Sequence, residues 1–247
     1  MQGSEKSWPF SIFALTHLMH WSKKTFKETQ DLPKKPQSWK DADQKALKNG
    51  FRATIFSLSG DSYRGDWKDH KKDGKGLYTW KDGSTYQGAW VQDLREGTGA
   101  YSEAVDGRLT LVYNGEWKED MMHGNGAYHY HNGDTYEGEW HQGKRQGEGK
   151  ITYANGDVYE GEMLGDQRSG RGYLLLANRD RYEGMWRNDQ KHGPGVFYYH
   201  SKKQKYEGEW EEGTACRGSL SGIDESDQTL PVLELLHPDK VLNSERR

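Results

Sequence analysis

The chain has 247 residues and is polar, with 32% hydrophobic and 30% charged residues and a mean hydropathy of −1.14. Such values are typical of disordered chains rather than of aliphatic cores. The formal net charge of −3 gives no overall field to attract DNA or RNA, so nucleic acid is not an expected partner. The only cysteine, Cys216, excludes an intrachain disulfide framework and a thiolate-cage zinc site and is typical of an intracellular protein.

Aromatic residues and glycine argue against disorder. The chain holds 10 tryptophans, 15 tyrosines, 6 phenylalanines and 31 glycines. Because large rings bury much apolar area per residue, a few of them can replace many aliphatic side chains. The composition therefore predicts a folded chain with a thin core built from rings.

The first 50 residues precede any regular pattern. The apolar segment Trp8–Trp21 is shorter than the ~20 residues that a membrane-spanning helix needs. Glu5 beside Lys6, and the histidines that close the segment, also distinguish it from a secretory signal. We expect residues 1–50 to form an N-terminal extension that is largely disordered or peripheral to the fold.

A repeat of about 23 residues dominates the rest of the chain. The motif Tyr-x-Gly-x-Trp recurs along it, with Met163 in place of tryptophan in the fifth copy. A Gly-x-Gly pair follows each of the first six tyrosines. The predicted repeat-core residues are Tyr63, Gly65, Trp67, Tyr86, Gly88, Trp90, Tyr113, Gly115, Trp117, Tyr136, Gly138, Trp140, Tyr159, Gly161, Tyr182, Gly184, Trp186, Tyr206, Gly208 and Trp210.

This spacing fits paired strands. Tyr63, Gly65 and Trp67 fall on one face of an extended strand because side chains alternate, while charged residues point to the other face. The central glycine leaves a slot where a ring from an adjacent strand can lie against the backbone. Asp-Gly and Asn-Gly dipeptides between copies are typical of tight hairpin turns, so each strand is expected to pair with its neighbour in sequence.

The predicted fold is all-β: an elongated, single-layer antiparallel sheet, a solenoid-like ribbon of tandem β-hairpins. Residues 51–219 form the array, with Phe51–Gly60 as a half repeat at one edge and six full repeats after it. The partial seventh copy, from Tyr206, lacks the glycine pair, so we expect the array to fray or be capped near Cys216.

Residues 220–247 are expected to form a C-terminal tail with a short capping or docking segment. Terminal strands expose unpaired backbone groups, which permits edge-to-edge homodimerisation unless Phe51–Leu58 and Pro231–Leu236 cover the edges. The sequence leaves the oligomeric state open.

The pattern of Tyr-x-Gly-x-Trp, Gly-x-Gly and a glycine-containing turn resembles the MORN (membrane occupation and recognition nexus) repeat over about residues 51–219. The resemblance implies a non-catalytic scaffold or adaptor that docks and tethers partner proteins. The flanks Ser38–Gly50 and Leu230–Leu242 resemble those of a small member of this family associated with male germ cells. This implies a role in spermatogenesis, in cytoplasmic, cytoskeletal, flagellar or acrosomal assemblies, with small germ-cell, cytoskeletal or regulatory proteins as partners.

Three departures interrupt the repeat. They are Met163, Arg179 at the position of a turn glycine, and an insertion at Asp106–Thr110. We expect these points to bend the ribbon or to mark the footprint of a partner.

Neither catalysis nor a cofactor is expected. The Gly-x-Gly pairs lack the following helix and the Lys-Ser/Thr of a phosphate loop. His129 and His131, near His141, form the best histidine cluster, but no third ligand or supporting shell can be identified, so surface histidines are the preferred interpretation. No Ser-His-Asp or paired-carboxylate arrangement stands out, and we predict no metal, no cofactor and no enzymatic activity.

The main functional prediction is a partner-binding groove on the ring-lined face. A single-layer sheet leaves that face partly open, and a large exposed apolar patch usually marks a partner. The second strand of the repeats often carries two rings where filling the core needs one. An alternative, that these rings only pack against the Tyr-x-Gly-x-Trp rings, stays open. The groove candidates are Tyr78, Trp80, Tyr128, Tyr130, Tyr153, Phe197 and Tyr199.

The second hypothesis is binding to membrane lipids, in particular phosphoinositides. An apolar segment beside a basic run can hold a protein to anionic lipid, and basic residues recur in the hairpin loops. Acidic residues are interleaved in the same loops, so no continuous positive stripe results and lipid is the less favoured partner. The basic residues concerned are Lys71, Lys72, Lys144, Arg145, Lys191 and His192 in loops, and Lys23, Lys24, Lys27, Lys34 and Lys35 after the apolar segment.

Overall fold

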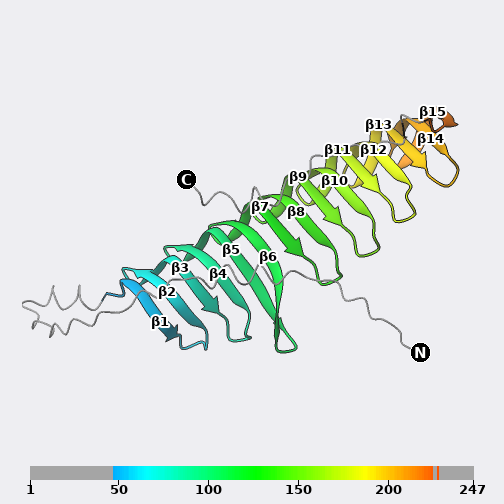
Figure 1. Cartoon of the computed structure of the whole chain (residues 1–247). Helices are drawn as coiled ribbons and strands as arrows, with labels where there is room; N and C mark the ends of the chain where they lie inside the picture. Colours follow the sequence, from blue (N-terminus) through cyan, green and yellow to red (C-terminus); the bar gives the residue numbers. More distant parts are fainter. Residues whose placement is uncertain (1–46, 225–226, 228–247) are drawn as a thin grey trace, which may run out of the picture. The chain divides into compact units, whose positions relative to one another are not determined.

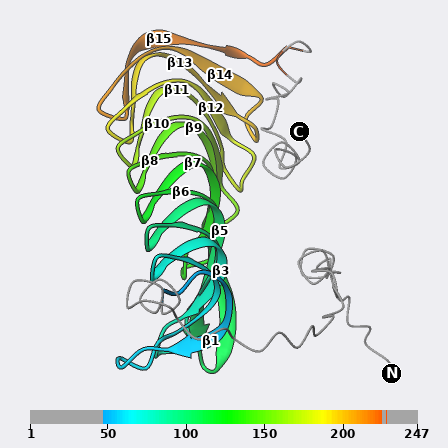
Figure 2. The same cartoon turned by 90° about the vertical axis from the view of Figure 1, so that its left-hand side faces the viewer.

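The computed structural model describes residues 47–224 and Asp227. In this part of the chain, 15 curved strands form one antiparallel sheet, and their order in space follows their order in sequence (Figures 1 and 2). The predicted all-β, single-layer fold is confirmed. The strands are β1 (Gly50–Phe56), β2 (Ser62–Lys68), β3 (Lys71–Thr79), β4 (Thr85–Val91), β5 (Leu94–Val105), β6 (Arg108–Lys118), β7 (Met121–His129), β8 (Thr135–His141), β9 (Lys144–Thr152), β10 (Val158–Leu164), β11 (Gln167–Leu175), β12 (Arg181–Arg187), β13 (Gln190–Tyr199), β14 (Gln204–Glu211) and β15 (Thr214–Gly222).

The described residues include no helix that is long and apolar enough to cross a bilayer. The predictions for the N-terminal segment Trp8–Trp21 and for the tail segment Pro231–Leu236 lie outside the described residues.

The tyrosine of each repeat lies across a pair of facing glycines. In the fourth repeat, Gly138 of β8 faces Gly149 of β9, and the Tyr136 ring covers the pair. The ring is fully buried, and its hydroxyl donates to the carbonyl oxygen of Glu139 at 2.8 Å. A Cβ atom on Gly149 would lie only 2.4 Å from the ring. The expected slot beside the central glycine exists, but the tyrosine of the same strand occupies it rather than a ring from an adjacent strand.

The two glycines of a Gly-x-Gly pair have different tasks. Gly147 has a φ of +90° and lies where the register between β8 and β9 shifts, so it needs a left-handed backbone. Gly149 has no positive φ and instead leaves room for the tyrosine ring. The spacing seen in the sequence thus combines a bulge with a packing site.

Tryptophan joins each repeat to the one before it. The Trp140 indole N–H donates to the carbonyl oxygen of Gly126 at 3.2 Å. Its ring meets Tyr136 and Tyr113 edge-on, with centroids 5.1 and 5.6 Å apart. Met163 takes this place in the fifth repeat and is buried, but it has no N–H to donate. Since β10 pairs with both neighbours, the substitution removes one link between repeats without interrupting the sheet.

Two kinds of turn alternate along the sheet. Within a repeat, a two-residue turn has positive φ at both positions, as at Asp69 (49°) and His70 (69°). This is the type I′ geometry that matches the twist of paired strands. Between repeats, except at the β5–β6 hairpin, the turn is longer and only its third residue is left-handed, as at Gly156 (92°) or Arg179 (71°). The expected Asp-Gly and Asn-Gly turns are therefore present, but they are not the tightest turns of the sheet.

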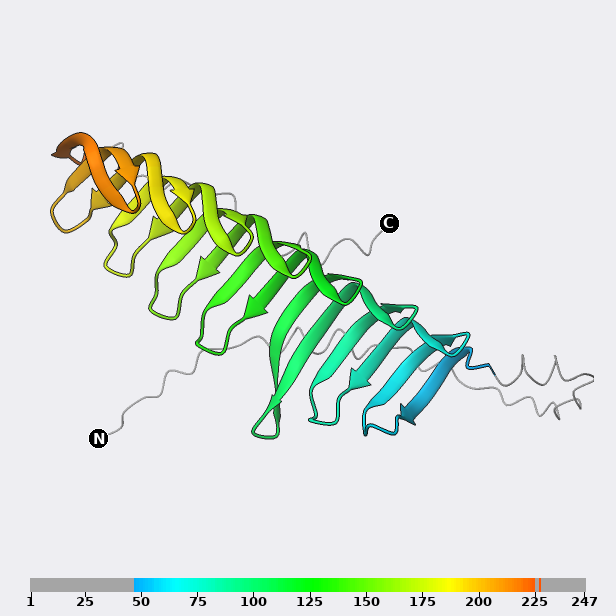
Figure 3. The same ribbon diagram turned by 180° about the vertical axis from the view of Figure 1, so that it is seen from behind.

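The inserted residues lengthen one hairpin. β5 and β6 have 12 and 11 residues, and the turn Asp106–Gly107 joins them. Their hairpin extends beyond its neighbours at one side of the sheet (Figures 1 and 3). Near its tip, Val105, Leu109 and Leu111 are exposed. The pairing order of the strands is unchanged, so the insertion adds a projection to the array.

Both terminal strands pair on one side only. β1 pairs with β2 in the position of a repeat's second strand. At the other end we expected the array to fray or be capped near Cys216, but β15 pairs with β14 as far as Gly222. A shift of register places Gly218 under the ring of Tyr206. The seventh hairpin therefore also has a glycine under its tyrosine ring, although Gly218 lies one position before the place where the motif has its second glycine.

Replacing Gly149 by alanine should lower the free energy of unfolding by roughly 1–3 kcal/mol, because the added methyl group would overlap the Tyr136 ring. The hydrogen bond from the Tyr136 hydroxyl to Glu139 keeps that ring from moving aside. Thermal unfolding followed by circular dichroism measures the change. Gly222→Ala is the control, since nothing lies within 4 Å of a Cβ there and its φ is not positive. Equal melting temperatures for the two variants would refute the packing role of Gly149.

Arg179→Gly should raise the free energy of unfolding by about 1 kcal/mol, because glycine adopts a left-handed conformation without the steric clash of a Cβ atom. The reverse change in the equivalent turn of the preceding repeat, Gly156→Arg, should lower it by a similar amount. Urea unfolding gives both differences. Shifts of the same sign in the two variants would show that backbone strain is not the cause.

Candidate functional site

The rings of the core lie on one side of the sheet, which we call the aromatic face; the opposite side is the charged face. Residues directly opposite each other in neighbouring strands point to the same side. Tyr136 lies opposite both Tyr128 and Ile151, and the same register recurs in the other repeats. Because the described strands make a single sheet, no second layer of strands covers the aromatic face within residues 47–224.

The seven predicted groove residues all belong to this face, in or just after the second strand of their repeats. Phe197 is buried, and the other six are partly buried. Tyr128 shows their packing, because its centroid lies 5.9 Å from that of Trp140 in the next repeat and 4.5 Å from that of Tyr130. The rings thus rest on the core and also present surface to solvent. Their use in binding a partner stays a prediction.

A row of cations rests on rings of the aromatic face, chiefly those of the repeat motif, and we call it the cation ladder. The Arg95 guanidinium lies 4.1 Å from the ring centroid of Trp117, and that of Arg168 lies 4.2 Å from the centroid of Trp186. At such distances a cation is attracted to the negative face of the ring. The ladder consists of Lys48, Lys72, Arg95, Arg145, Arg168 and Lys191.

An aspartate in the turn of the next repeat holds most ladder cations. The backbone N–H and the Nε of Arg168 donate to Oδ1 of Asp189 at 2.9 and 3.1 Å, and its Nη2 donates to the carbonyl oxygen of Asp189 at 2.8 Å. The carboxylates are half exposed, so each ion pair stabilises the sheet by less than about 1 kcal/mol and mainly orients the cation. The other pairs are Lys72–Asp93, Arg95–Asp120 and Arg145–Asp166.

Sequence reasoning missed the ladder and assigned Lys72, Arg145 and Lys191 to loops that face lipid. The structure places them on the rings instead. A signal was present, because an aspartate follows the cation after 21 residues, as from Arg145 to Asp166. Only the pairing of successive hairpins brings these two positions together.

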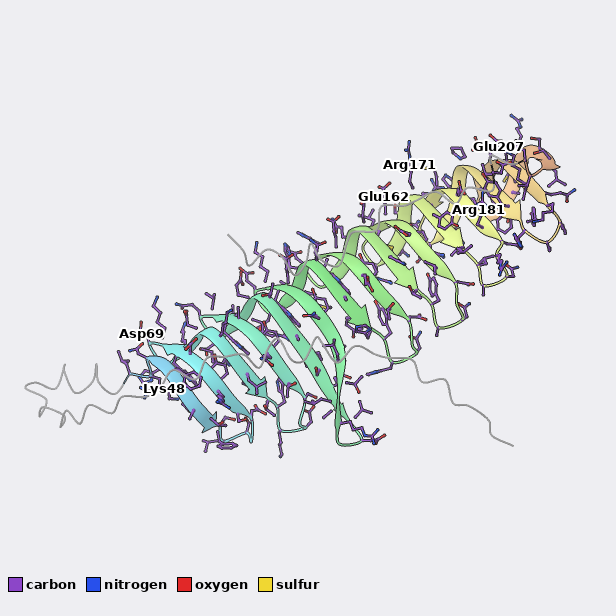
Figure 4. All side chains as sticks on the ribbon, in the orientation of Figure 1. Lys48, Asp69, Glu162, Arg171, Arg181 and Glu207 are labelled. Atoms are coloured by element: carbon purple, nitrogen blue, oxygen red, sulfur yellow. The ribbon has the colours of Figure 1, made fainter. Side chains whose placement is uncertain are left out.

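On the charged face, acidic residues support the backbone of the adjoining strand. The Glu162 carboxylate accepts a hydrogen bond from the backbone N–H of Arg171 at 2.8 Å and lies over Gly170 (Figure 4). Glutamates in two earlier repeats make the same bond, Glu116 to Asn125 and Glu139 to Glu148. These side chains, which the alternation pattern assigned to a solvated face, stabilise the bulge at the first glycine of three pairs, namely Gly124, Gly147 and Gly170.

At the C-terminal end of the sheet, the chain's own residues occupy the charged face. The Arg181 guanidinium lies 3.7 Å from the ring centroid of Tyr198, and its Nε donates to Glu183 at 2.8 Å. Asp227 pairs with Lys205 at 2.7 Å, and its carbonyl oxygen accepts a bond from Arg181. This part of the charged face is therefore less open than the aromatic face.

The histidines that formed the best cluster in the sequence take separate partners. His131 lies 3.0 Å from the Glu103 carboxylate, whereas the His141 ring packs on that of His123 with centroids 5.0 Å apart. Within residues 47–224 and Asp227, no group of three or more histidine, cysteine or acidic side chains is placed to hold a metal ion.

The chain matches the family model of the MORN repeat at seven places, which together cover more than half of it. Each match begins at the tyrosine of a repeat described above. The matched segments are residues 63–85, 86–102, 113–135, 136–158, 159–181, 182–203 and 206–216.

Curated relatives are similar over shorter stretches. MORN repeat-containing protein 3 of Xenopus laevis is 46% identical over 50 residues, which is 20% of this chain and 21% of that protein. The Bos taurus protein of the same name is 58% identical over 38 residues (15% and 16%), and the Homo sapiens protein is 51% identical over 45 residues (18% and 19%). Each match thus spans about a fifth of the relative or less.

Among solved structures, the SAS-4 TCP domain of Drosophila melanogaster, in complex with a proline-rich motif of Ana2, covers 79% of this chain and 97% of its own. The identity is 8% and the TM-score 0.31, which is below the range that indicates a shared fold.

The buried tyrosines should couple the stability of the sheet to alkaline pH. Burial raises the pKa of Tyr182 to about 12, with the Glu209 charge adding to the shift. Burial and the hydrogen bond to Asp61 raise the pKa of Tyr78 to about 12 as well. Because both values exceed the ordinary pKa of about 10, this contribution to stability is complete below pH ~10 and is lost as the pH rises toward 12.

We therefore expect phenolate absorbance and loss of the circular dichroism of the sheet to appear together in that window. The urea-denatured chain is the control and should titrate near pH ~10 without cooperativity. Ionisation of all tyrosines near pH ~10 with the sheet intact would contradict the burial of these rings.

Proposed function

Because the chain belongs to the MORN repeat family, we propose that it is a non-catalytic scaffold that binds and tethers partner proteins along its aromatic face. The repeats of this family point to binding of proteins or membranes, and the arrangement of this face favours proteins. The setting we propose is a cytoskeletal, flagellar or acrosomal assembly of male germ cells. This setting rests on the similarity to MORN repeat-containing protein 3.

The observation that carries the proposal is the row of partly buried rings on a face that no second layer of strands covers within residues 47–224. Six of the seven groove candidates keep part of their surface exposed while they pack on the buried core rings. Tyrosine and tryptophan contribute large, rigid contact areas and are enriched in the energetically important part of protein interfaces. A partner segment placed on this face would complete the burial of rings that the sheet alone leaves half covered.

The cation ladder supports the same conclusion. Its cations lie over rings, and aspartates orient most of them, so little side-chain freedom is lost when a partner binds. Arginine next to aromatic rings is also typical of protein interfaces. The aromatic face therefore offers polar and apolar contacts in a fixed geometry.

Binding to phosphoinositides is the alternative function, and two observations weaken it. Lys72 and Arg145, which were counted among its basic residues, are paired with Asp93 and Asp166. Lys71 donates to the side-chain oxygen of Gln92. Four of the six loop cations that would meet a lipid surface, including Lys191, are thus held on the protein or over its rings.

A display library of random peptides, selected against the purified full chain, tests the proposal. The selected peptides should bind the double variant Tyr130→Ser/Tyr199→Ser at least about tenfold more weakly, because it removes two partly exposed rings. Fluorescence anisotropy measures the affinities. The control is Glu137→Ser on the charged face of β8, which should bind as the unchanged chain does.

Failure to enrich any peptide, or equal binding to the ring variant, would contradict a binding role for this face. Co-sedimentation with phosphoinositide-containing liposomes at physiological salt tests the alternative in parallel. We expect the full chain to stay in the supernatant. Sedimentation that high salt abolishes would favour the lipid function instead.

A further inference from the structure

Five of the six ladder cations meet a hydrogen-bond acceptor in the turn of the next repeat. For Lys48 the acceptor is Nδ1 of His70, and for the next four it is an aspartate. The sixth cation, Lys191, meets Gly213. Within residues 47–224 and Asp227, no carboxylate lies at ion-pair distance from Lys191. The last rung of the ladder thus has a cation without an anion.

The turn at Gly213 keeps the backbone geometry of the other rungs. The Gly213 N–H donates to the carbonyl oxygen of Lys191 at 3.0 Å, as the Asp189 N–H donates to that of Arg168 at 3.1 Å. The φ of Gly213 is 83° and that of Asp189 is 65°, so both are left-handed. Gly213 differs from Asp189 only in lacking the carboxylate side chain. The backbone N–H and the ammonium of Lys191 therefore border the place that a carboxylate takes elsewhere in the ladder.

In the third repeat both members of the pair are absent, the aspartate and the cation. Gly143 replaces the aspartate there, and the residue at the ladder position is the apolar Met122. At Lys191 the cation is retained although its surroundings disfavour the charge. Burial and the nearby Arg168 charge lower the pKa of Lys191. The Lys191 ammonium lies 4.5–5.2 Å from the ring centroids of Tyr182, Phe197 and Trp210.

We propose that Lys191 binds the carboxylate of an aspartate or glutamate side chain in a partner protein segment that lies on the aromatic face at β13 and β14. The carboxylate accepts hydrogen bonds from the Lys191 backbone N–H and ammonium, as Asp189 does from Arg168. Tyr199 and Tyr206, which are partly buried on the same face, contact apolar residues beside the acid. The inference rests on the proposed function, which it deepens by stating the chemistry of the partner.

The first experiment supplies the carboxylate from the chain itself. Gly213→Asp should melt about 1–3 °C above Gly213→Asn, because both side chains carry the same strain at this left-handed turn position but only the carboxylate pairs with Lys191. Gly143→Asp, compared in the same way with Gly143→Asn, is the matched control and should give a smaller gain, since Met122 offers a backbone N–H but no cation. Adding Lys191→Met to Gly213→Asp should abolish the gain. No gain from Gly213→Asp, or an equal gain from Gly143→Asp, would overturn the proposal.

The second experiment uses the display-selected peptides as probes of the full chain. Those that bind at the last repeats should contain an aspartate or glutamate next to apolar residues. They should bind Gly213→Asp at least about tenfold more weakly, because the internal carboxylate competes for Lys191, and Gly143→Asp unchanged. Substituting the acid in the peptide by its amide should weaken binding to the unchanged chain and have little effect on Gly213→Asp.

The outcomes separate the two proposals. Peptides that need Tyr130 and Tyr199 but carry no acid, or that bind Gly213→Asp as tightly as the unchanged chain, would overturn the role of Lys191 and leave the scaffold function standing. If no peptide depends on the rings, the scaffold function fails, and the role of Lys191 in partner binding fails with it. The melting temperature of Gly213→Asp then still shows whether the rung accepts a carboxylate.

Discussion

The contact between a tyrosine ring and a pair of facing glycines is the interaction on which the rest of the sheet depends. A sheet without a second layer has nothing to pack against except its own side chains. Laying a ring across glycine backbone, as Tyr136 does over Gly138 and Gly149, makes a core that is one side chain thick. Burying a ring of this size stabilises the fold by several kcal/mol, on the order of 25 cal/mol for each Å² of apolar surface. The half-exposed ion pairs of the cation ladder each stabilise the fold by less than about 1 kcal/mol, so their contribution is small beside that of the buried rings.

Coupling between repeats passes through tryptophan. From Trp90 onward, each indole of the motif bonds to a glycine carbonyl of the preceding repeat and packs on that repeat's tyrosine, so contacts are made chiefly between neighbours. Arrays of this kind gain stability from each added interface and leave open edges at both ends. Met163 is buried at one interface but has no N–H to donate, so the junction between the fourth and fifth repeats lacks this hydrogen bond.

The same face carries the core and the candidate binding surface. In a protein with two layers these tasks fall to different residues, whereas here Tyr128 packs on Trp140 and also meets solvent. The half-covered rings are a consequence of the single layer, and a partner that covers them removes more apolar surface from water. The charged face offers a partner less free surface, because several of its glutamates bond to the backbone at the bulges and Asp227 covers its C-terminal part.

The sequence by itself determined the repeat, the pairing of neighbouring strands and which rings share a face. These follow from local rules: alternation along a strand, the spacing of tyrosine, glycine and tryptophan, and turn dipeptides. Only the tertiary structure decided where cations such as Arg145 rest, because its ring and its aspartate lie in different hairpins, 21 residues apart for Asp166. It also decided that Gly218 lies under the tyrosine ring of the seventh repeat, because this position depends on a register shift between paired strands that the motif does not reveal. Likewise, the anion missing beside Lys191 becomes evident only when Gly213 is compared with its neighbours in space.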